Sequence, residues 1–204
     1  WKDLPLRKDA AERIYYTVAD NAAPIVAIGT DAKLASGTLR LSYKYDPLPA
    51  EQRLTLQGYR EEYVRSLIVS MLSTRLHEQK MQQEAPEEFK LSFFDGDYSL
   101  AMTKKAFSGT ATFGRDHWEQ AMHALVYPLK QVMDHGFTAD EFVRMQQQLQ
   151  AWIPSLEEGV GMTMPNQALV QRCMAHFLHH QPLLSPSEEA KAYRHILSSV
   201  TLEE

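Results

Sequence analysis

The chain has 204 residues, of which 44% are hydrophobic and 23% are charged, and its formal net charge is −5. This is the composition of an ordinary globular domain, which excludes a disordered or fibrous protein, and no apolar run reaches the roughly 18 residues that a transmembrane helix needs. The acidic balance argues against nucleic acid as a partner, because domains that bind phosphate backbones are usually basic.

The N-terminal part is mixed and polar before the first clear element. We interpret residues 1–22 as a connector from a preceding domain, with a short strand predicted around Ile14–Val18, and residues 23–204 as one domain. The chain begins with Trp1 and shows no signal peptide, which indicates a piece of a longer polypeptide. After "PIVAIGTD", residues 37–46 alternate leucine and tyrosine with polar residues, which predicts a half-buried strand of an antiparallel sheet.

A long helix and further strands are predicted next. Apolar residues recur at spacings of three and four from Leu54 to Gln83, so this helix should lie across the sheet as its main cover, and Pro86 should end it. Residues 89–93 alternate, and Asp95-Gly96 is a strong hairpin signal. "SLAMT" and "SGTATF" continue as one or two strands, with Gly109 as a bulge or bend.

The C-terminal half is predicted to be helical. Pro128 should kink its first helix, and Gly136 should end that helix. Two capping boxes mark later helix starts: Thr138 with Glu141, and Ser185 with Glu188. Between them, a helix is expected from about Asn166 to His180. Strands grouped apart from helices predict an α+β domain, with helices packed on one face of a mostly antiparallel sheet.

The stretch "MAHFLHHQ" contains the histidine cluster, which we define as His176, His179 and His180. Its spacing, H-x-x-H-H, differs by one residue from the zinc signature H-x-x-E-H. His176 and His180 would share a helix face and could bind one metal, but the carboxylate base is missing. Three interpretations remain open: a helix C-terminus favoured by the macrodipole, an adventitious surface metal site, or a catalytic site without its base.

Other candidates are weaker. "RLHEQ" holds His77 and Glu78, but no second histidine follows four residues after the first, and "EEGVGMTMP" lacks the Lys-Ser/Thr ending of a phosphate loop.

Cys173 is expected to be a buried structural thiol. As the single cysteine it excludes an internal disulfide but leaves the compartment open. Lys104-Lys105 is expected in a solvated or edge segment. Four methionines are expected to pack in the core: Met102, Met122, Met133 and Met145.

Several segments, in this order, resemble the insulinase/pitrilysin family of zinc metallopeptidases. They are "GTLRLSYKYDPLP", "YREEYVRSLIVSMLSTRLHEQ", "APEEFKLSFF", "ALVYPLKQVMDHGFTADEFVRMQQQL" and "AKAYRHILSSVTLEE". The resemblance covers roughly residues 24–204 and implies a domain of the mitochondrial processing peptidase/insulinase type. In the catalytic domain of this family, H-x-x-E-H lies on the first long helix, whereas the corresponding helix here, 54–83, contains only His77.

The family also has an Arg-to-Tyr substrate-binding pair in a partner domain. Arg75 and Leu76 match the start of its pattern, but His77 stands where the second arginine would be, and no Gly-x-x-Tyr follows. This departure fits an internal domain, the second of a long multi-domain member, better than the substrate-binding domain.

The resemblance therefore implies a catalytically inactive, peptidase-like domain of a zinc metalloendopeptidase. It implies no catalytic or metal-binding residue and no cofactor in this chain, leaves substrate-binding residues unknown, and places zinc in the catalytic domain of the parent. That domain of the same polypeptide is the expected partner, an extended peptide substrate is a further candidate, and the periplasm or cell envelope is the expected location. Two alternatives stay open: a non-enzymatic scaffold module of the cell envelope, and a metal-binding domain that uses the histidine cluster.

Overall fold

A computed structural model describes residues 9, 11, 14–82, 89–98, 101, 103–158 and 166–203. The elements follow one another as β1 (Ser36–Tyr45), α1 (Ala50–Arg53), α2 (Leu56–Gln82), β2 (Lys90–Asp97), β3 (Lys105–Gly114), α3 (Trp118–His135), α4 (Ala139–Glu158), α5 (Asn166–His179) and α6 (Pro186–Leu197). The predicted α+β class is confirmed, and so is the separation of strands from the C-terminal helices.

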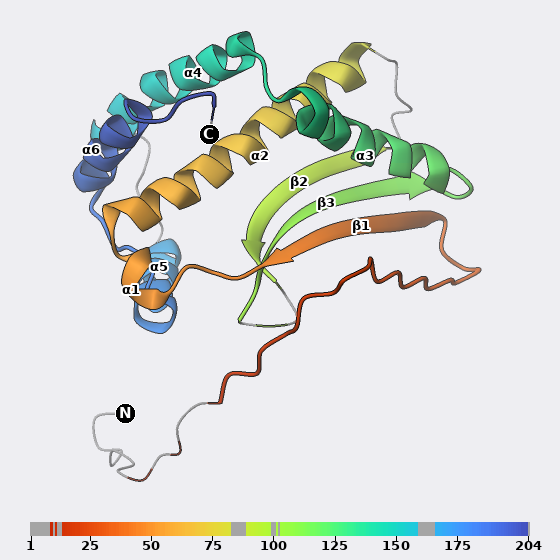
Figure 1. Cartoon of the computed structure of the whole chain (residues 1–204), viewed down its shortest axis with the longest axis horizontal. Coiled ribbons are helices and arrows are strands. Elements are labelled where there is room, and N and C mark those ends of the chain that lie inside the picture. Colours follow the sequence, from red (N-terminus) through yellow and green to blue (C-terminus); the bar gives the residue numbers. More distant parts are fainter. Residues whose placement is uncertain are drawn as a thin grey trace.

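The sheet has three antiparallel strands in the order β1-β3-β2. Gly109 in the central strand faces Leu41 of β1 and Phe93 of β2. On this face the alternation of the sequence buries Phe93 and Ala111, and Figure 1 shows α2 and α3 on the same side of the sheet. Helices therefore cover one face of an antiparallel sheet, as the sequence predicted.

The long helix α2 is shared by two hydrophobic clusters. Toward its start, Tyr63, Leu67 and Met71 join residues of α4 and α6. Toward its end, Leu72 and Leu76 join residues of the sheet and of α3. Figure 1 shows α2 running diagonally between these two groups of elements. The prediction of a long helix over residues 54–83 is confirmed to within two residues at each end.

Three predicted helix boundaries are confirmed, namely the end at Gly136 and the starts after Thr138 and Ser185. Gly136 has a φ of 70° and donates its amide to the Val132 carbonyl at 2.8 Å. Thr138 and Ser185 each accept from the backbone N–H of a glutamate three residues later, whose carboxylate accepts in return. Pro128 is buried inside α3, which continues to His135, and the predicted kink stays a prediction.

The predicted hairpin turn at Asp95-Gly96 is wrong. Asp95-Gly96 is not a turn, because both residues pair in register with β3, and the connection closes later through the Tyr98 amide and the Lys104 carbonyl at 3.0 Å. The Tyr45 hydroxyl donates to the Asp95 carboxylate at 2.7 and 2.8 Å, which holds that side chain over the sheet. "SLAMT" lies partly outside the described residues, and its described members, Ala101 and Thr103, are not in a strand.

Gly109 is also not a bulge, since it pairs residue for residue with both neighbouring strands. A Cβ at this position would lie 2.9 Å from Phe93 Cε1 and 3.0 Å from Leu125 Cδ1. Gly109 therefore permits α3 to approach the sheet closely, which is another common reason for glycine inside a strand.

The N-terminal segment, defined here as residues 14–35, contains no strand, so the prediction of a strand at Ile14–Val18 is wrong. Side chains of the sheet and its loops bind carbonyls along it: Thr103 Oγ1 binds Tyr16 at 2.9 Å, and Lys44 Nζ binds Ala19 at 3.2 Å. These carbonyls are satisfied by side chains rather than by a strand ladder. The interpretation of residues 1–22 as a connector stays a prediction. The predicted end of the long helix at Pro86 also stays a prediction, because Pro86 lies outside the described residues.

Candidate functional site

The histidine cluster lies at the C-terminal end of α5. His180 has a φ of 52°, which ends the helix, and its amide donates to the His176 carbonyl at 3.1 Å. The Nδ1 atom of His176 lies 2.7 Å from the carbonyl oxygen of Gln181, and Arg53 Nη1 donates to the His179 carbonyl at 2.9 Å. These contacts support the interpretation as a helix C-terminus, where the last carbonyls need donors.

Within the described part of the chain, no group of three or more His, Cys, Asp or Glu side chains is arranged to hold a metal ion. On α2, where the family resemblance would place a zinc pair, His77 is exposed, and Glu78 forms a 3.4 Å ion pair with Arg144 of α4.

Arg75, which matches the start of the family's substrate-binding pattern, is bound within the fold. Its Nε and Nη2 atoms donate to the two carboxylate oxygens of Glu141 at 2.7 and 2.6 Å, and both side chains are largely buried. Its guanidinium also lies over the ring of Phe137, 5.1 Å from the centroid. The hydrogen bonds from Arg75, more than those from Thr138, lower the pKa of Glu141 to about 2. Arg75 thus joins α2 to the start of α4.

Lys104 corrects the expectation of a solvated or edge pair of lysines. Its side chain is buried, and its Nζ atom lies 2.8 Å from both Asp20 and Asp46. Lys105 starts the central strand and forms a 2.7 Å ion pair with Glu62. The two aspartates compensate the buried charge and raise the pKa of Lys104. Lys104 therefore ties the N-terminal segment to the end of the sheet.

Helix α5 faces the domain with a side made of small and polar residues. The residues partly buried against the domain recur at helical spacing and are Ala168, Arg172, Ala175 and His179. Arg172 reaches the Leu184 carbonyl at 3.2 Å and Glu189 at 3.4 Å. None of the 14 residues of α5 is fully buried.

The opposite side of α5 is apolar and exposed. We call it the α5 apolar face and define it by Leu169, Val170, Cys173, Met174, Phe177 and Leu178, which together line one surface hollow. Phe177 is 81% exposed. The prediction that Cys173 is buried is therefore wrong, because the apolar side of this helix points away from the domain.

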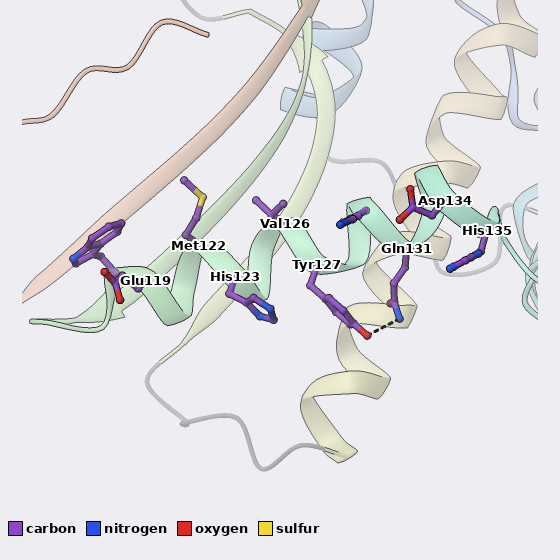
Figure 2. A pocket seen from close by; sticks show the side chains of 10 residues that line it. Glu119, Met122, His123, Val126, Tyr127, Gln131, Asp134 and His135 are labelled. Carbon is purple, nitrogen blue, oxygen red and sulfur yellow. Dashed lines mark hydrogen bonds between the residues drawn. The ribbon is translucent and has the colours of Figure 1, made fainter.

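A second exposed surface follows the outer side of α3. Figure 2 shows Met122, His123, Val126 and Tyr127 projecting from this helix, with the Tyr127 hydroxyl accepting a 3.1 Å hydrogen bond from Gln131. All the residues that line this hollow come from α3 alone. Groups that converge from several elements are typical of a reaction site, whereas a hollow along one helix has the geometry of a contact surface.

The prediction that four methionines pack in the core is correct for one of them and wrong for two. Met145 is buried in the cluster between α2, α4 and α6, as expected. Met122 and Met133 are exposed, so for these two the prediction is wrong. The apolar stripe of α3 is wider than the part that the sheet covers, and Ala121 and Leu125 occupy that part. Met102 lies outside the described residues.

The outer backbone edges of β1 and β2 are unpaired within the described part of the chain. Among the described residues, no backbone hydrogen bond joins the outer edge of β1 or of β2 to another segment. Such an edge can accept an extended peptide as an additional strand.

Comparison with solved structures identifies the architecture. A predicted insulinase family protease from Yersinia pestis superimposes with a TM-score of 0.68 at 15% identity, over 81% of this chain and 34% of that chain. The periplasmic protease PqqL from Escherichia coli gives 0.69 at 19% identity, over 82% and 18%. The chain has the fold of an insulinase-family protease domain.

A third structure agrees. A mutant of the ferredoxin protease FusC, in complex with Arabidopsis ferredoxin, gives a TM-score of 0.62 at 14% identity, over 85% of this chain and 19% of that chain. The chain thus spans between about a fifth and a third of the length of these proteins. No protein-family model and no curated protein matches the chain.

These likenesses confirm the fold that the family resemblance predicted. They concern proteases in which the matched part is one portion of a longer chain. No helix within the described residues is both long and apolar enough to cross a membrane.

Sequence reasoning missed the α5 apolar face. Its residues recur in adjacent pairs every four positions, which reveals an amphipathic helix but not which side faces the domain.

Proposed function

We propose that this chain is a non-catalytic, peptidase-like domain of a multi-domain zinc metalloendopeptidase, and that it holds the catalytic domain in place. The α5 apolar face carries this proposal. A helix that turns Arg172 inward and Phe177 outward gains little by packing on its own domain. Burial of one such large apolar side chain against a partner is worth roughly 1.5–3 kcal/mol, so the face favours a stable contact with another domain.

The fold supports the choice of partner. Each structural neighbour is a protease of which this fold makes up only a portion, so a further domain of the same polypeptide is the natural occupant of the α5 apolar face. An interface within one chain needs no high affinity, because the linker keeps the local concentration of the partner domain high.

Lack of catalysis in this chain is supported by the residues of α2. A zinc peptidase of this type needs two histidines and a glutamate base on one helix turn, and α2 has one histidine, His77. Arg75 is bound to Glu141 and is not available for a substrate. The zinc ion and the hydrolytic base would belong to the catalytic domain of the parent protein.

Two further features complete the proposal. The open edges of β1 and β2 could accept an extended peptide by strand addition, so the domain would help to line the substrate chamber. A location in the periplasm or cell envelope is proposed because one structural neighbour, PqqL, is a periplasmic protease.

The test places a charge on the α5 apolar face in the full-length protein. We expect Phe177→Asp to lower peptide hydrolysis and to speed limited proteolysis between domains, because a carboxylate there must be desolvated in the interface. Gln171→Asp, on the same helix and also exposed, introduces the same charge outside the face and should change neither. Unchanged hydrolysis and proteolysis in Phe177→Asp would contradict the proposal. Absence of any zinc-dependent hydrolysis in the full-length protein would favour the scaffold alternative.

A further inference from the structure

The N-terminal segment runs antiparallel to β1. At one end, the Lys44 side chain binds the Ala19 carbonyl at 3.2 Å. At the other end, a turn connects the segment to β1: the Leu34 amide donates to the Asp31 carbonyl at 3.2 Å, and the Lys33 amide to Asp31 Oδ1 at 2.9 Å. Figure 1 shows the segment following β1 and then turning back into it. This is the connectivity of a hairpin.

The numbering of the contacts defines how the two arms would pair. In an antiparallel hairpin, the residue numbers of facing positions add up to a constant. The backbone bond between Leu34 and Asp31 gives 65. The Lys44 side chain reaches the Ala19 carbonyl, a contact that would also fit a register shifted by two residues, which gives 63. Both values are odd. Either register therefore places Val26 and Ile28 on the same face of the sheet as Leu39 and Leu41, which pack against the core.

The middle of this segment resembles a strand that has no partner. Ile25, Val26 and Ile28 are 79%, 77% and 85% exposed, and β-branched residues of this kind favour strands. Nothing lies within 4 Å of the Cβ position of Gly29. No backbone hydrogen bond among the described residues joins residues 21–30 to β1, whose outer edge is open.

Contacts at both ends of the N-terminal segment keep it close to the outer edge of β1. Lys104 binds Asp20 at 2.8 Å at one end, and Arg115 Nη2 binds the carbonyls of Ala32 and Leu34 at 2.8 Å at the other. Closure of a segment fixed at both ends costs much less chain entropy than docking of a free peptide.

We propose that residues 24–30 pair with the outer edge of β1 as a fourth strand and so guard this edge against extended peptides. In the open arrangement the edge is available, and in the closed arrangement the chain occupies it with its own strand, with Val26 and Ile28 extending the apolar row of β1. Only the competition with a peptide substrate depends on the proposed function, whereas the strand pairing does not.

Pairing is tested by disulfide trapping in the full-length protein with Cys173→Ser. The variants Ile25→Cys/Arg40→Cys and Ala23→Cys/Arg40→Cys correspond to the two registers and join exposed positions on the outer face. Val26→Cys/Arg40→Cys is the control, because its sulfur atoms would lie on opposite faces. We expect one of the first two to cross-link at least about tenfold faster than the control, since only paired strands hold the sulfurs in reach. Equal rates in all three would overturn the pairing.

Hydrogen exchange provides a second measurement that needs no cysteine. The β1 amides that do not donate to β3 should be protected in the unaltered protein and should exchange about tenfold faster in Ile25→Pro/Ala27→Pro. The Ala35 carbonyl accepts from the Arg115 amide on the β3 side, so the even-numbered residues of β1 face its outer edge, and in either register the amides of Ile25 and Ala27 would point toward them. Amides of α4 report that the fold is intact. The absence of protection on these β1 amides in the unaltered protein would overturn the proposal.

The guarding role is tested with a fluorescein-labelled synthetic peptide of residues 22–32. We expect it to bind Ile25→Pro/Ala27→Pro more tightly than the disulfide-trapped variant, in which the edge is occupied. Equal binding would overturn the guarding role. If trapping blocks the peptide but leaves substrate hydrolysis by the parent enzyme unchanged, then the proposed contact of this edge with substrate is wrong, while the pairing stands.

Discussion

Arg75 illustrates how one residue can match a family pattern and still serve the fold. Its bidentate contact with Glu141, its position over Phe137 and the capping contact of Glu141 with Thr138 connect α2 to the α3–α4 turn. Charged side chains that are largely buried and paired in this way leave an uncompensated charge when one partner is removed.

Arg75→Ala should therefore destabilise the protein. We expect a loss of roughly 2 kcal/mol in the free energy of unfolding, between the values typical of exposed and of buried pairs. Arg144→Ala is the control, because the Arg144–Glu78 pair is about half exposed and 3.4 Å long, and it should cost at most a few tenths of a kcal/mol. Urea denaturation measures both, and similar losses in the two variants would contradict the structural role of Arg75.

The same pair predicts a dependence of stability on pH. The pKa of Glu141 is lowered from 4.5 to about 2, chiefly by its hydrogen bonds from Arg75. The unfolded chain therefore takes up a proton at Glu141 before the folded chain does, so this contribution is complete above pH 4.5 and declines as the pH falls toward 2. In Glu141→Gln this decline should be smaller than in the unaltered protein. Thermal unfolding between pH 6 and pH 2.5 would reveal it, and identical slopes would contradict it.

At the scale of elements, close packing decides what a short sequence signal means. Gly109 and Gly96 both lie in strands, and both suggested a turn or irregularity. In the sheet, Gly109 is the point where α3 meets β3, while nothing surrounds the Cβ position of Gly96. Packing also decides the orientation of α5. Its apolar side is exposed because no other element among the described residues packs against that side.

Gly109→Ala should consequently destabilise the domain by about 1–3 kcal/mol, because the added methyl group would overlap Phe93 and Leu125. Gly96→Ala, also in a strand, should be neutral or slightly stabilising, because it meets no atom and restricts the unfolded chain. Midpoints of chemical denaturation compare the two. A neutral Gly109→Ala variant would show that α3 can shift away from the sheet at little cost.

At the scale of the whole molecule, the fold and the function are separable. The insulinase-type fold appears in proteases in which it forms only part of the chain, and in this chain the groups that such a fold uses for hydrolysis are not found on α2. Among the described residues, the domain exposes three kinds of surface: the α5 apolar face, the outer side of α3 and the unpaired outer edges of β1 and β2.

Metal analysis tests this view of the whole molecule. We expect the full-length protein to bind zinc, and His176→Ala to leave the zinc content unchanged, because the Nδ1 atom of His176 is engaged with the Gln181 carbonyl at the helix end. Zinc per molecule can be measured by atomic emission after dialysis. A loss of one zinc equivalent in His176→Ala would establish the metal-binding alternative for the histidine cluster.

The sequence by itself determined the α+β class, the long helix α2, the strand β1 and the capped helix starts at Thr138 and Ser185. These features depend on periodicity and on hydrogen bonds between residues a few positions apart, and such signals are complete within a short stretch. The family resemblance added the type of fold, which the solved structures confirm.

Only the tertiary structure decided the roles of Lys104, Arg75, Gly109 and α5. Lys104 can be buried because its charge is paired with Asp20, which is 84 positions away in the sequence but adjacent in space. Arg75 is bound by Glu141, which is 66 positions further along the chain. Gly109 is required by a side chain of α3, and α5 presents apolar residues outward because its polar side contacts the domain. Each of these outcomes depends on a contact between distant parts of the chain, and no local pattern contains that information.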